Sequence, residues 1–365
     1  MIIKQLEFNN YTNYQQEKIE FDTSVNIITG ENAQGKSNLI DGIFFLGNGR
    51  SHRQNRDLLL IKWGETYFRI KGEINNKKGN FLIEHAVKKE KKLIKVNGLS
   101  LDNLKQLLGL FSVIIFTPDD LNLIKEGPDY RRRFLNRKIV QLNPLFYEKL
   151  LNYQKNLLQR NNLLKRGSVS KGEVEIWNEQ LSDVGSELIL ERIKTLLKLQ
   201  PIYQEIHLEL SGTREQLDLK YRSSFPLSEN ITKEELKELF QKKLHDRLKD
   251  DLRKGFTTIG PHRDDFNCYL NKIDARVYGS QGQQRTAVLT LKLAMLKLLK
   301  QETGEFPVLL LDDVFSELDQ NRREFLLKAV GNSIQTIITT TDLSAFGRNK
   351  IKEAKIIHIK KGKIV

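Results

Sequence analysis

The residues best suited to chemistry lie in one short stretch that matches the phosphate-binding pattern G-x-x-x-x-G-K-S. Its glycines permit backbone angles that other residues resist, so the N–H groups of the loop can converge on phosphate oxygens. Lys36 would place its charge at the β- and γ-phosphates of a nucleotide, and Ser37 would offer its hydroxyl to Mg²⁺. The residues predicted to contact the nucleotide are Gly30, Glu31, Asn32, Ala33, Gln34, Gly35, Lys36, Ser37 and Asn38.

The elements beside this stretch are those that a phosphate site requires. Residues 25–28 predict a strand, and residues 38–46 predict a helix whose N-terminal end adds partial positive charge. The alternative is a glycine-rich turn that merely caps a helix, and the strand and helix together favour the phosphate site. A basic loop broken by glycines, Gly-Asn-Gly-Arg-Ser-His-Arg at residues 47–53, follows the helix. It either folds back onto a nucleotide or is a solvated connection, and both interpretations stay open.

A second chemical feature is the apolar run Val-Leu-Leu-Leu at residues 308–311, which ends in two acids. A phosphate site needs a carboxylate at the end of a buried parallel strand to hold Mg²⁺, and Asp312 is placed for that role. Asp313 comes next and could orient the attacking water as a general base. The alternative is a core strand that ends at a polar turn. The phosphate-binding motif upstream favours the Mg²⁺ site over this alternative.

A third feature is the polar, glycine-containing loop at residues 279–285, which opens a helix. Such a helix N-terminus is suited to binding an anion. Ser280 could bond the γ-phosphate from the side opposite Lys36, with Gly282 and Gln283 beside it. Taken alone, the segment is more typical of an ordinary helix N-cap.

Composition restricts the partners and the compartment. The 365 residues carry a formal net charge of +14, which favours a polyanion such as nucleic acid or an acidic membrane surface. A lysine-rich proteome is the alternative source of this charge. Cys268 is the only cysteine, so we expect no disulfide and a reducing compartment. The N-terminus lacks the features of a signal peptide, and no apolar run approaches the roughly 20 residues of a membrane span. We therefore expect a soluble, cytoplasmic protein with no membrane partner.

The periodicity of the sequence predicts an α/β protein in two parts. Residues 1–119 and 256–365 alternate strands with helices, whereas residues 120–255 form a helical insertion, a compact arm. Within the insertion, Pro201 predicts a kink or a stop. Residues 275–278 predict a short strand. The long predicted helices begin near residues 128, 143, 173 and 232, the last with a capping box.

A β-meander is predicted at residues 66–96, with a tight turn at Asn97 and Gly98. Basic side chains gather at one end of it. They could meet DNA phosphates or could simply form a solvated face. Trp63 and Trp177 are expected in the core. The clustered residues are Lys88, Lys89, Lys91, Lys92 and Lys95.

The order of these features resembles the ABC-type ATPase head, in which two heads sandwich two nucleotides. Ser-Gln-Gly-Gln at residues 280–283 resembles the signature motif, and Ser-Glu-Leu-Asp at residues 316–319 resembles the D-loop. The long separation of Ser37 from Ser280 is similar to that of SMC-like repair ATPases with an inserted lobe. Within that group the whole chain resembles the RecF family. The segments that carry the resemblance are residues 32–39, 49–53, 131–135, 260–265, 280–285 and 311–319.

The resemblance implies a fold, a chemistry and a set of partners. The fold would be an ABC-type ATPase head with a mixed sheet and an inserted helical lobe. ATP and Mg²⁺ would be the cofactors, Ser37 and Asp312 the metal residues, and Asp313, Lys36 and Ser280 the catalytic residues. It also implies an ATP-dependent homodimer that hydrolyses ATP slowly, with stimulation by DNA, and binds DNA at gaps and single/double-strand junctions. The resemblance further implies RecR as a partner, with RecO and RecA in the same pathway. Together with RecR and RecO, the protein would support the loading of RecA onto DNA and the SOS response.

Two departures from the wider ABC pattern stand out. Asp313 occupies the position where transporters carry glutamate, and Thr340, Thr341 and Asp342 follow the next strand where transporters carry a switch histidine. Thr341 and Asp342 are both candidates for the histidine's role, with neither assigned, and the Q-loop glutamine has no assigned position after Phe116.

Two other functions, and one metal site, are less consistent with the sequence. An OLD-type P-loop nuclease would need a metal-binding domain after the ATPase core, but only about fifty residues follow Asp313. The basic helical insertion and the missing switch histidine speak against an ABC transporter cassette. His262, Asp264 and Asp265 lack the spacing of a standard metal motif, so we expect a structural or lobe-interface role for them.

Overall fold

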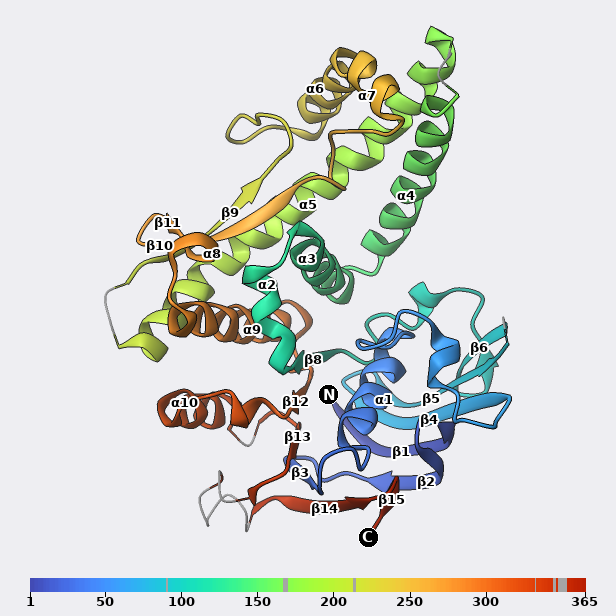
Figure 1. Ribbon diagram of the computed structural model, residues 1–365, viewed down its shortest axis with the longest axis vertical. Coiled ribbons are helices and arrows are strands. Elements are labelled where there is room, and N and C mark those ends of the chain that lie inside the picture. Colours follow the sequence, from blue (N-terminus) through green and yellow to red (C-terminus); the bar gives the residue numbers. More distant parts are fainter. Residues whose placement is uncertain (90, 167–169, 213–214, 332, 344–345, 347–352) are drawn as a thin grey trace. The chain divides into compact units, whose positions relative to one another are not determined.

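The computed structural model describes the chain except residues 90, 167–169, 213–214, 332, 344–345 and 347–352 (Figure 1). The chain forms two compact units, a head unit (Met1–Asp120 and Met295–Val365) and an inserted unit (Leu121–Ala294). The first boundary predicted from sequence, at 119/120, lies one residue from this division. The second, predicted at 255/256, differs from the observed 294/295, because β10 (Asp265–Leu270) pairs with β9 (Leu217–Arg222) inside the insertion.

A six-stranded sheet of the head unit carries the predicted chemical residues. Its order is β15-β14-β3-β13-β12-β8, with parallel pairing throughout except at the short terminal β15. Strands buried on both faces are built from continuous apolar runs, as β12 shows. The strands are β3 (Val25–Thr29), β8 (Val113–Phe116), β12 (Val308–Asp312), β13 (Thr336–Thr340), β14 (Lys355–Lys360) and β15 (Lys363–Ile364).

A second, antiparallel sheet of the head unit has the order β2-β1-β4-β5-β6-β7. It confirms the predicted meander, and the tight turn between β6 and β7 has positive φ at both Asn97 and Gly98, as a type I′ hairpin requires. The strands are β1 (Ile2–Tyr11), β2 (Tyr14–Glu20), β4 (Tyr67–Asn76), β5 (Gly79–Lys88), β6 (Lys91–Val96) and β7 (Leu99–Ser100).

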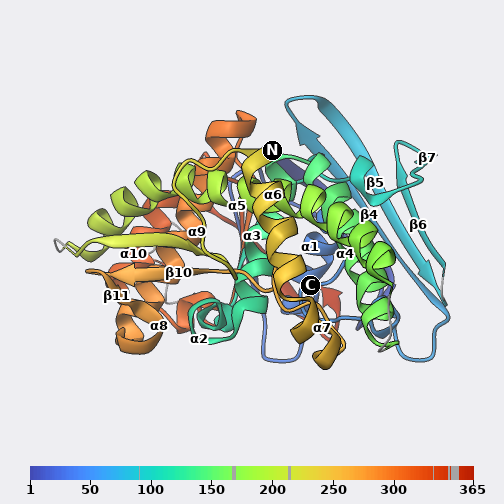
Figure 2. The same ribbon diagram turned by 90° about the horizontal axis from the view of Figure 1, so that it is seen from above.

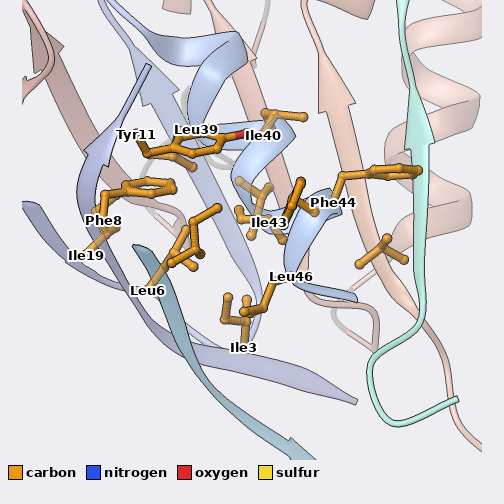
Figure 3. Packing of buried hydrophobic residues seen from close by; sticks show 14 of the residues in the cluster. Ile3, Leu6, Phe8, Tyr11, Ile19, Leu39, Ile40, Ile43, Phe44 and Leu46 are labelled. Carbon is orange, nitrogen blue, oxygen red and sulfur yellow. The ribbon is translucent and has the colours of Figure 1, made fainter. Parts of the chain in front are cut away.

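The main core of the head unit surrounds α1 (Lys36–Asn48), the helix that follows the phosphate-binding loop. This helix contacts β8, β12 and β13 of the mixed sheet and β4 and β5 of the antiparallel sheet. Figure 3 shows Ile40, Ile43 and Leu46 of α1 packed among the apolar side chains of β1 and β2, such as Phe8 and Ile19. Because α1 is buried on several sides, the start of the helix is held in a fixed position between the two sheets.

One buried histidine of the head unit makes its stability sensitive to acid. His85 is fully buried, its Nε2 lies 3.0 Å from the carbonyl oxygen of Leu46, and burial lowers its pKa from 6.5 to about 4. Between pH 6.5 and 4, His85 is therefore protonated in the unfolded chain but mostly neutral in the folded chain. We expect the free energy of unfolding to fall by roughly 3 kcal/mol through this group as the pH drops from 6.5 to 4.

This pH dependence is measurable by denaturant unfolding at several pH values. The His85→Leu variant should show a flatter dependence between pH 6.5 and 4 than the parent protein. His358, which is exposed on β14, supplies the matched control, and His358→Leu should leave the dependence unchanged. Equal slopes for His85→Leu and the parent would contradict the prediction.

The inserted unit is mainly helical. Figures 1 and 2 show α4 (Leu145–Leu164) and α5 (Lys171–Ser211) side by side, in agreement with their mutual contacts. Thr232 and Glu235 form the predicted capping box at the start of α6. Its helices are α2 (Asn122–Lys125), α3 (Pro128–Leu142), α4, α5, α6 (Lys233–Asp246), α7 (Leu248–Lys254), α8 (Ala275–Tyr278) and the first part of α9 (Gln281–Thr303), up to Ala294. The short strand β11 (Ile273–Asp274) completes a small sheet with β9 and β10.

Two local predictions were wrong, and the stop predicted as one possibility at Pro201 does not occur. Helix α5 continues through Pro201, because Leu199 and Tyr203 on either side are fully buried and their packing outweighs the missing backbone hydrogen bond. Residues 275–278 form α8 because the side chain of Asp274 caps the Arg276 N–H. Trp63 is 99% exposed, just after the short 3-10 helix η1 (Asp57–Leu60), and therefore does not belong to the core.

Two of the family-like segments meet inside the inserted unit. The Arg131 guanidinium donates two hydrogen bonds of 2.8 Å to the buried Asp265 carboxylate. His262 contacts the Tyr153 hydroxyl at 2.8 Å, and Asp264 accepts from Tyr221. These side chains are used in packing the unit, and the part of the chain that the structure describes contains no group of three or more His, Cys, Asp or Glu residues able to hold a metal ion. Across that same part, no helix combines the length and the apolar character needed to cross a bilayer.

Candidate nucleotide site

The phosphate-binding loop joins β3 to α1, as the sequence predicts. The Lys36 side chain is buried, and its Nζ donates to the carbonyl oxygens of Gly30 at 2.6 Å and of Glu31 at 2.8 Å. The loop therefore wraps around the ammonium group. Burial lowers the pKa of Lys36, while the carboxylates of Asp313 and Asp312 act in the opposite direction. Those acids thus lie close enough to Lys36 to form one electrostatic group with it.

The two glycines of the motif are required by close contacts. A Cβ on Gly30 would lie 2.3 Å from the carbonyl oxygen of Ile359, and one on Gly35 would lie 2.4 Å from the side-chain nitrogen of Asn13. Gly35 also has φ of 118°, which side chains disfavour. The loop is thus a tightly fitted cradle of backbone groups at the start of a helix, and this shape and charge suit the phosphates of a nucleotide.

The turn between β1 and β2 supports the loop from outside, which the sequence did not reveal. Asn13 donates from Nδ2 to the carbonyl oxygen of Gln34 at 2.9 Å and accepts from Asn38 Nδ2 at 2.8 Å. The Tyr14 hydroxyl donates to the carbonyl oxygen of Gly35 at 2.9 Å. Neither residue belongs to a recognisable motif, because their contacts depend on how β1 and β2 pair.

The basic loop at residues 49–53 folds back against α1. Its anchor is the buried Asp41 carboxylate, which accepts from Ser51 Oγ, from the His52 backbone N–H and from the Tyr11 hydroxyl. Burial alone would raise the pKa of Asp41, but these hydrogen bonds and His52 lower it on balance. Arg53 then reaches Asn38 at 3.0 Å, one residue beyond Ser37. The loop is therefore held beside the phosphate-binding loop rather than left as a solvated connection.

The two acids after β12 are organised by a threonine of the neighbouring strand. Thr339 Oγ1 donates to Asp312 Oδ1 at 2.7 Å and accepts from the Asp313 N–H at 3.0 Å. Sequence reasoning missed Thr339. The signal would have been the parallel pairing of β12 with β13, which sets Asp312 opposite Thr339.

Asp313 has the properties of a residue held for function. Its φ is 51°, an uncommon conformation for a residue other than glycine. Burial raises its pKa, Asp312 and Glu317 raise it further, and Lys36 lowers it. Ser316 Oγ donates to the Asp313 carbonyl oxygen at 2.7 Å and so fixes the start of the segment resembling the D-loop. That segment continues from η4 (Val314–Ser316) to Asp319, the N-cap of α10 (Gln320–Val330).

The loop resembling the signature motif belongs to the inserted unit, whereas the phosphate-binding loop and the acids belong to the head unit. Ser280 is exposed and caps α9: its Oγ accepts from the Gln283 N–H at 3.2 Å, and its own N–H donates to Gln283 Oε1 at 2.9 Å. Gly282 follows within the first turn. The structure therefore brings Lys36, Ser37, Asp312 and Asp313 into one unit and places Ser280, Gly282 and Gln283 in the other.

The predicted basic cluster is only partly free for a partner. Lys92 Nζ donates to the Gly49 carbonyl oxygen and to Asp57, and it also lies 4.7 Å from the centre of the Phe45 ring. Lys88, Lys89 and Lys91, at the end of the β5–β6 hairpin, have exposed side chains. Three of the five lysines thus face solvent, Lys92 stabilises the loop beside α1, and Lys95 is half-buried.

Comparison with known proteins relates the whole chain to one protein family. Residues 2–363 match the family model described as the RecF/RecN/SMC N terminal domain. The chain is 41% identical over 365 residues to the DNA replication and repair protein RecF of Clostridium perfringens, covering 100% of this chain and 99% of that protein. It is 42% identical over 366 residues to RecF of Clostridium acetobutylicum, with coverage of 100% and 99%.

Solved structures give the same result for the fold. A structure of the recombination mediator protein RecF-ATP in the RecFOR pathway matches with a TM-score of 0.92 and 38% identity, over 100% of this chain and 96% of that one. A Pyrococcus furiosus Smc head domain matches with a TM-score of 0.58 and 18% identity, over 100% and 95% of the two chains, which supports the fold alone. The predicted fold class, an ABC-type ATPase head with an inserted helical lobe, is confirmed. The chain belongs to the RecF family of SMC-like, ABC-type ATPases.

Proposed function

We propose that this chain is an ATP-dependent DNA-binding protein of recombinational repair and replication. The observation that carries the proposal is the grouping of Lys36, Asp312 and Asp313 in one unit, with Thr339 joining the two acids. A charged lysine inside a glycine cradle, facing acids at the end of a parallel strand, is the arrangement that phosphoryl transfer requires. Relatives described as RecF-ATP support ATP as the nucleotide.

Each side chain of the site has a distinct role in this proposal. Lys36 and the loop N–H groups hold the phosphates, and Ser37 and Asp312 hold Mg²⁺, which would neutralise phosphate charge. Asp313 orients the attacking water and takes up its proton, a role that its raised pKa suits. Since aspartate has a shorter side chain than the glutamate of transporters, we expect slow ATP hydrolysis.

The exposed Ser280 points to a second copy of the chain. In the proposed dimer, Ser280, Gly282 and Gln283 of one copy contact the nucleotide held by the other. Ser280 lies at the start of α9, a helix of 23 residues, where backbone N–H groups and the hydroxyl favour an anion. ATP would therefore join two heads, and hydrolysis would release them.

DNA is the proposed polyanionic partner of the joined heads. The net charge of +14 and the exposed Lys88, Lys89 and Lys91 support contacts with phosphates independent of sequence. We propose binding at gaps and single/double-strand junctions, with DNA stimulating the slow ATPase. The RecFOR pathway named for the relative supports cooperation with RecR and RecO, and hence with RecA loading and the SOS response.

Solution mass measured by light scattering tests the proposal. The mass of the protein is determined alone, with ATP and Mg²⁺, and with ADP and Mg²⁺, each with and without a gapped DNA duplex. We expect the mass to double only with ATP, and the doubled species to retain the duplex. A mass indifferent to ATP, together with DNA binding that ATP does not change, would overturn the proposal.

A further inference from the structure

The carboxylate of Glu215 links the loop around Ser280 to α5 within the inserted unit. Its Oε1 accepts a hydrogen bond from Gln283 Nε2 at 3.1 Å, and its Oε2 lies 3.7 Å from His207 Nε2. The Glu215 side chain is 27% exposed, and that of His207 on α5 is 2% exposed. The carboxylate is therefore half-buried between the loop and a long, well-packed helix.

Gln283 uses both ends of its side-chain amide. Its Oε1 accepts from the Ser280 N–H at 2.9 Å, while its Nε2 donates to Glu215. An ionised carboxylate only accepts hydrogen bonds, so it selects the amide orientation in which the NH₂ group faces Glu215 and the oxygen faces Ser280. In the reversed orientation the NH₂ group would face the Ser280 N–H, and two donors would oppose each other. Glu215 thus determines which end of the amide meets the backbone of Ser280.

This orientation also determines how Ser280 presents its hydroxyl group. The Gln283 backbone N–H donates to Ser280 Oγ at 3.2 Å, which closes a reciprocal cap of the S-x-x-Q type. The oxygen accepts in this cap and the side chain is exposed. The O–H hydrogen of Ser280 therefore remains available to donate to a group outside the chain.

We propose that Glu215 is a positioning residue for Ser280, acting through Gln283. The inference rests on the proposed function, in which Ser280 of one copy contacts the nucleotide of the second. Glu215 itself touches neither nucleotide nor metal in this proposal. It fixes the amide of Gln283, and the amide fixes the backbone and the hydroxyl of Ser280 before the two heads meet, which reduces the entropy lost on docking.

The test compares Glu215→Ala with Glu215→Gln, which can place an amide oxygen where the carboxylate accepts from Gln283. The measurements are ATP-dependent dimerisation by light scattering, kcat and KM for ATP, and fluorescent-nucleotide binding under conditions where the protein is monomeric. For Glu215→Ala we expect dimerisation and kcat to fall about tenfold, with monomer nucleotide binding and thermal unfolding unchanged. Glu215→Gln should recover most of both losses. The matched control is Glu238→Ala, on the exposed face of α6, which should behave as the parent protein.

A double-mutant cycle adds a second check. Gln283→Ala should cause a similar loss, and the double variant with Glu215→Ala should lose little more than either single variant, because both act through one amide. Full additivity would contradict the inference, as would a Glu215→Gln variant as weak as Glu215→Ala. If Glu215→Ala dimerises normally while Ser280→Arg does not, the inference fails and the proposed function stands. If both variants dimerise normally, the proposed function fails as well.

Discussion

A Lys36→Arg variant will lose the ATP-dependent doubling of mass, and its ATP hydrolysis will fall at least about 100-fold. The Lys36 ammonium group is a compact charge enclosed by the carbonyl oxygens of Gly30 and Glu31 at 2.6 and 2.8 Å. The planar guanidinium group of arginine is larger and cannot occupy this space without moving the loop. Charge is kept but geometry is lost, so nucleotide-dependent DNA retention should weaken as well.

The measurements for Lys36→Arg are light scattering and a phosphate-release assay, each with ATP and Mg²⁺. The matched control is Lys18→Arg, the same exchange at an exposed position of β2, which should leave both quantities unchanged. Thermal unfolding in the absence of nucleotide should be similar for the parent and both variants. A Lys36→Arg protein that still doubles its mass with ATP would show that the loop does not hold the phosphates as proposed.

A Ser280→Arg variant will bind ATP as a monomer but will not dimerise. Ser280 lies in the inserted unit, whereas the phosphate-binding loop lies in the head unit, so a change at Ser280 leaves the chain's own loop intact. The exposed hydroxyl would be replaced by a long cationic side chain at the proposed dimer contact. Hydrolysis should fall about 100-fold, because the second half of the nucleotide site would be missing.

Two measurements separate binding from dimerisation in Ser280→Arg. Fluorescent-nucleotide binding should match the parent protein, whereas light scattering with ATP and Mg²⁺ should report the monomer mass. Ser228→Arg places the same side chain at an exposed position elsewhere in the inserted unit and should dimerise normally. Normal dimerisation of Ser280→Arg would refute the sandwich arrangement and leave Ser280 as an ordinary helix cap.

Local patterns in the sequence were sufficient for the parts of the site that are built from contiguous residues. The phosphate-binding loop, the acid-ended strand and the cap at Ser280 each depend on a few neighbouring residues whose backbone geometry follows from their types. Hydrophobic periodicity likewise gave the meander and the long helices. Where a local signal competed with packing, packing prevailed, as it did at Pro201, where burial on both sides of the proline keeps α5 continuous.

These local patterns could not predict contacts between residues that are distant in the sequence. Thr339 reaches Asp312 only because β12 and β13 pair in parallel, and Asn13 reaches Gln34 only because the β1–β2 turn packs against the loop. Glu215 meets Gln283 across 68 positions of sequence. No periodicity within either segment encodes such a pairing.

The sequence by itself determined which residue types are available for chemistry: those suited to phosphate binding, those that end the acidic strand, and the long segment between Ser37 and Ser280. These follow from the conformational preferences of short segments, which neighbouring residues set. The tertiary structure decided the support of that chemistry, namely the cradle around Lys36, the threonine between the two acids and the carboxylate behind Ser280. Such support depends on strand register and helix packing, because only the folded chain brings those side chains within hydrogen-bonding distance.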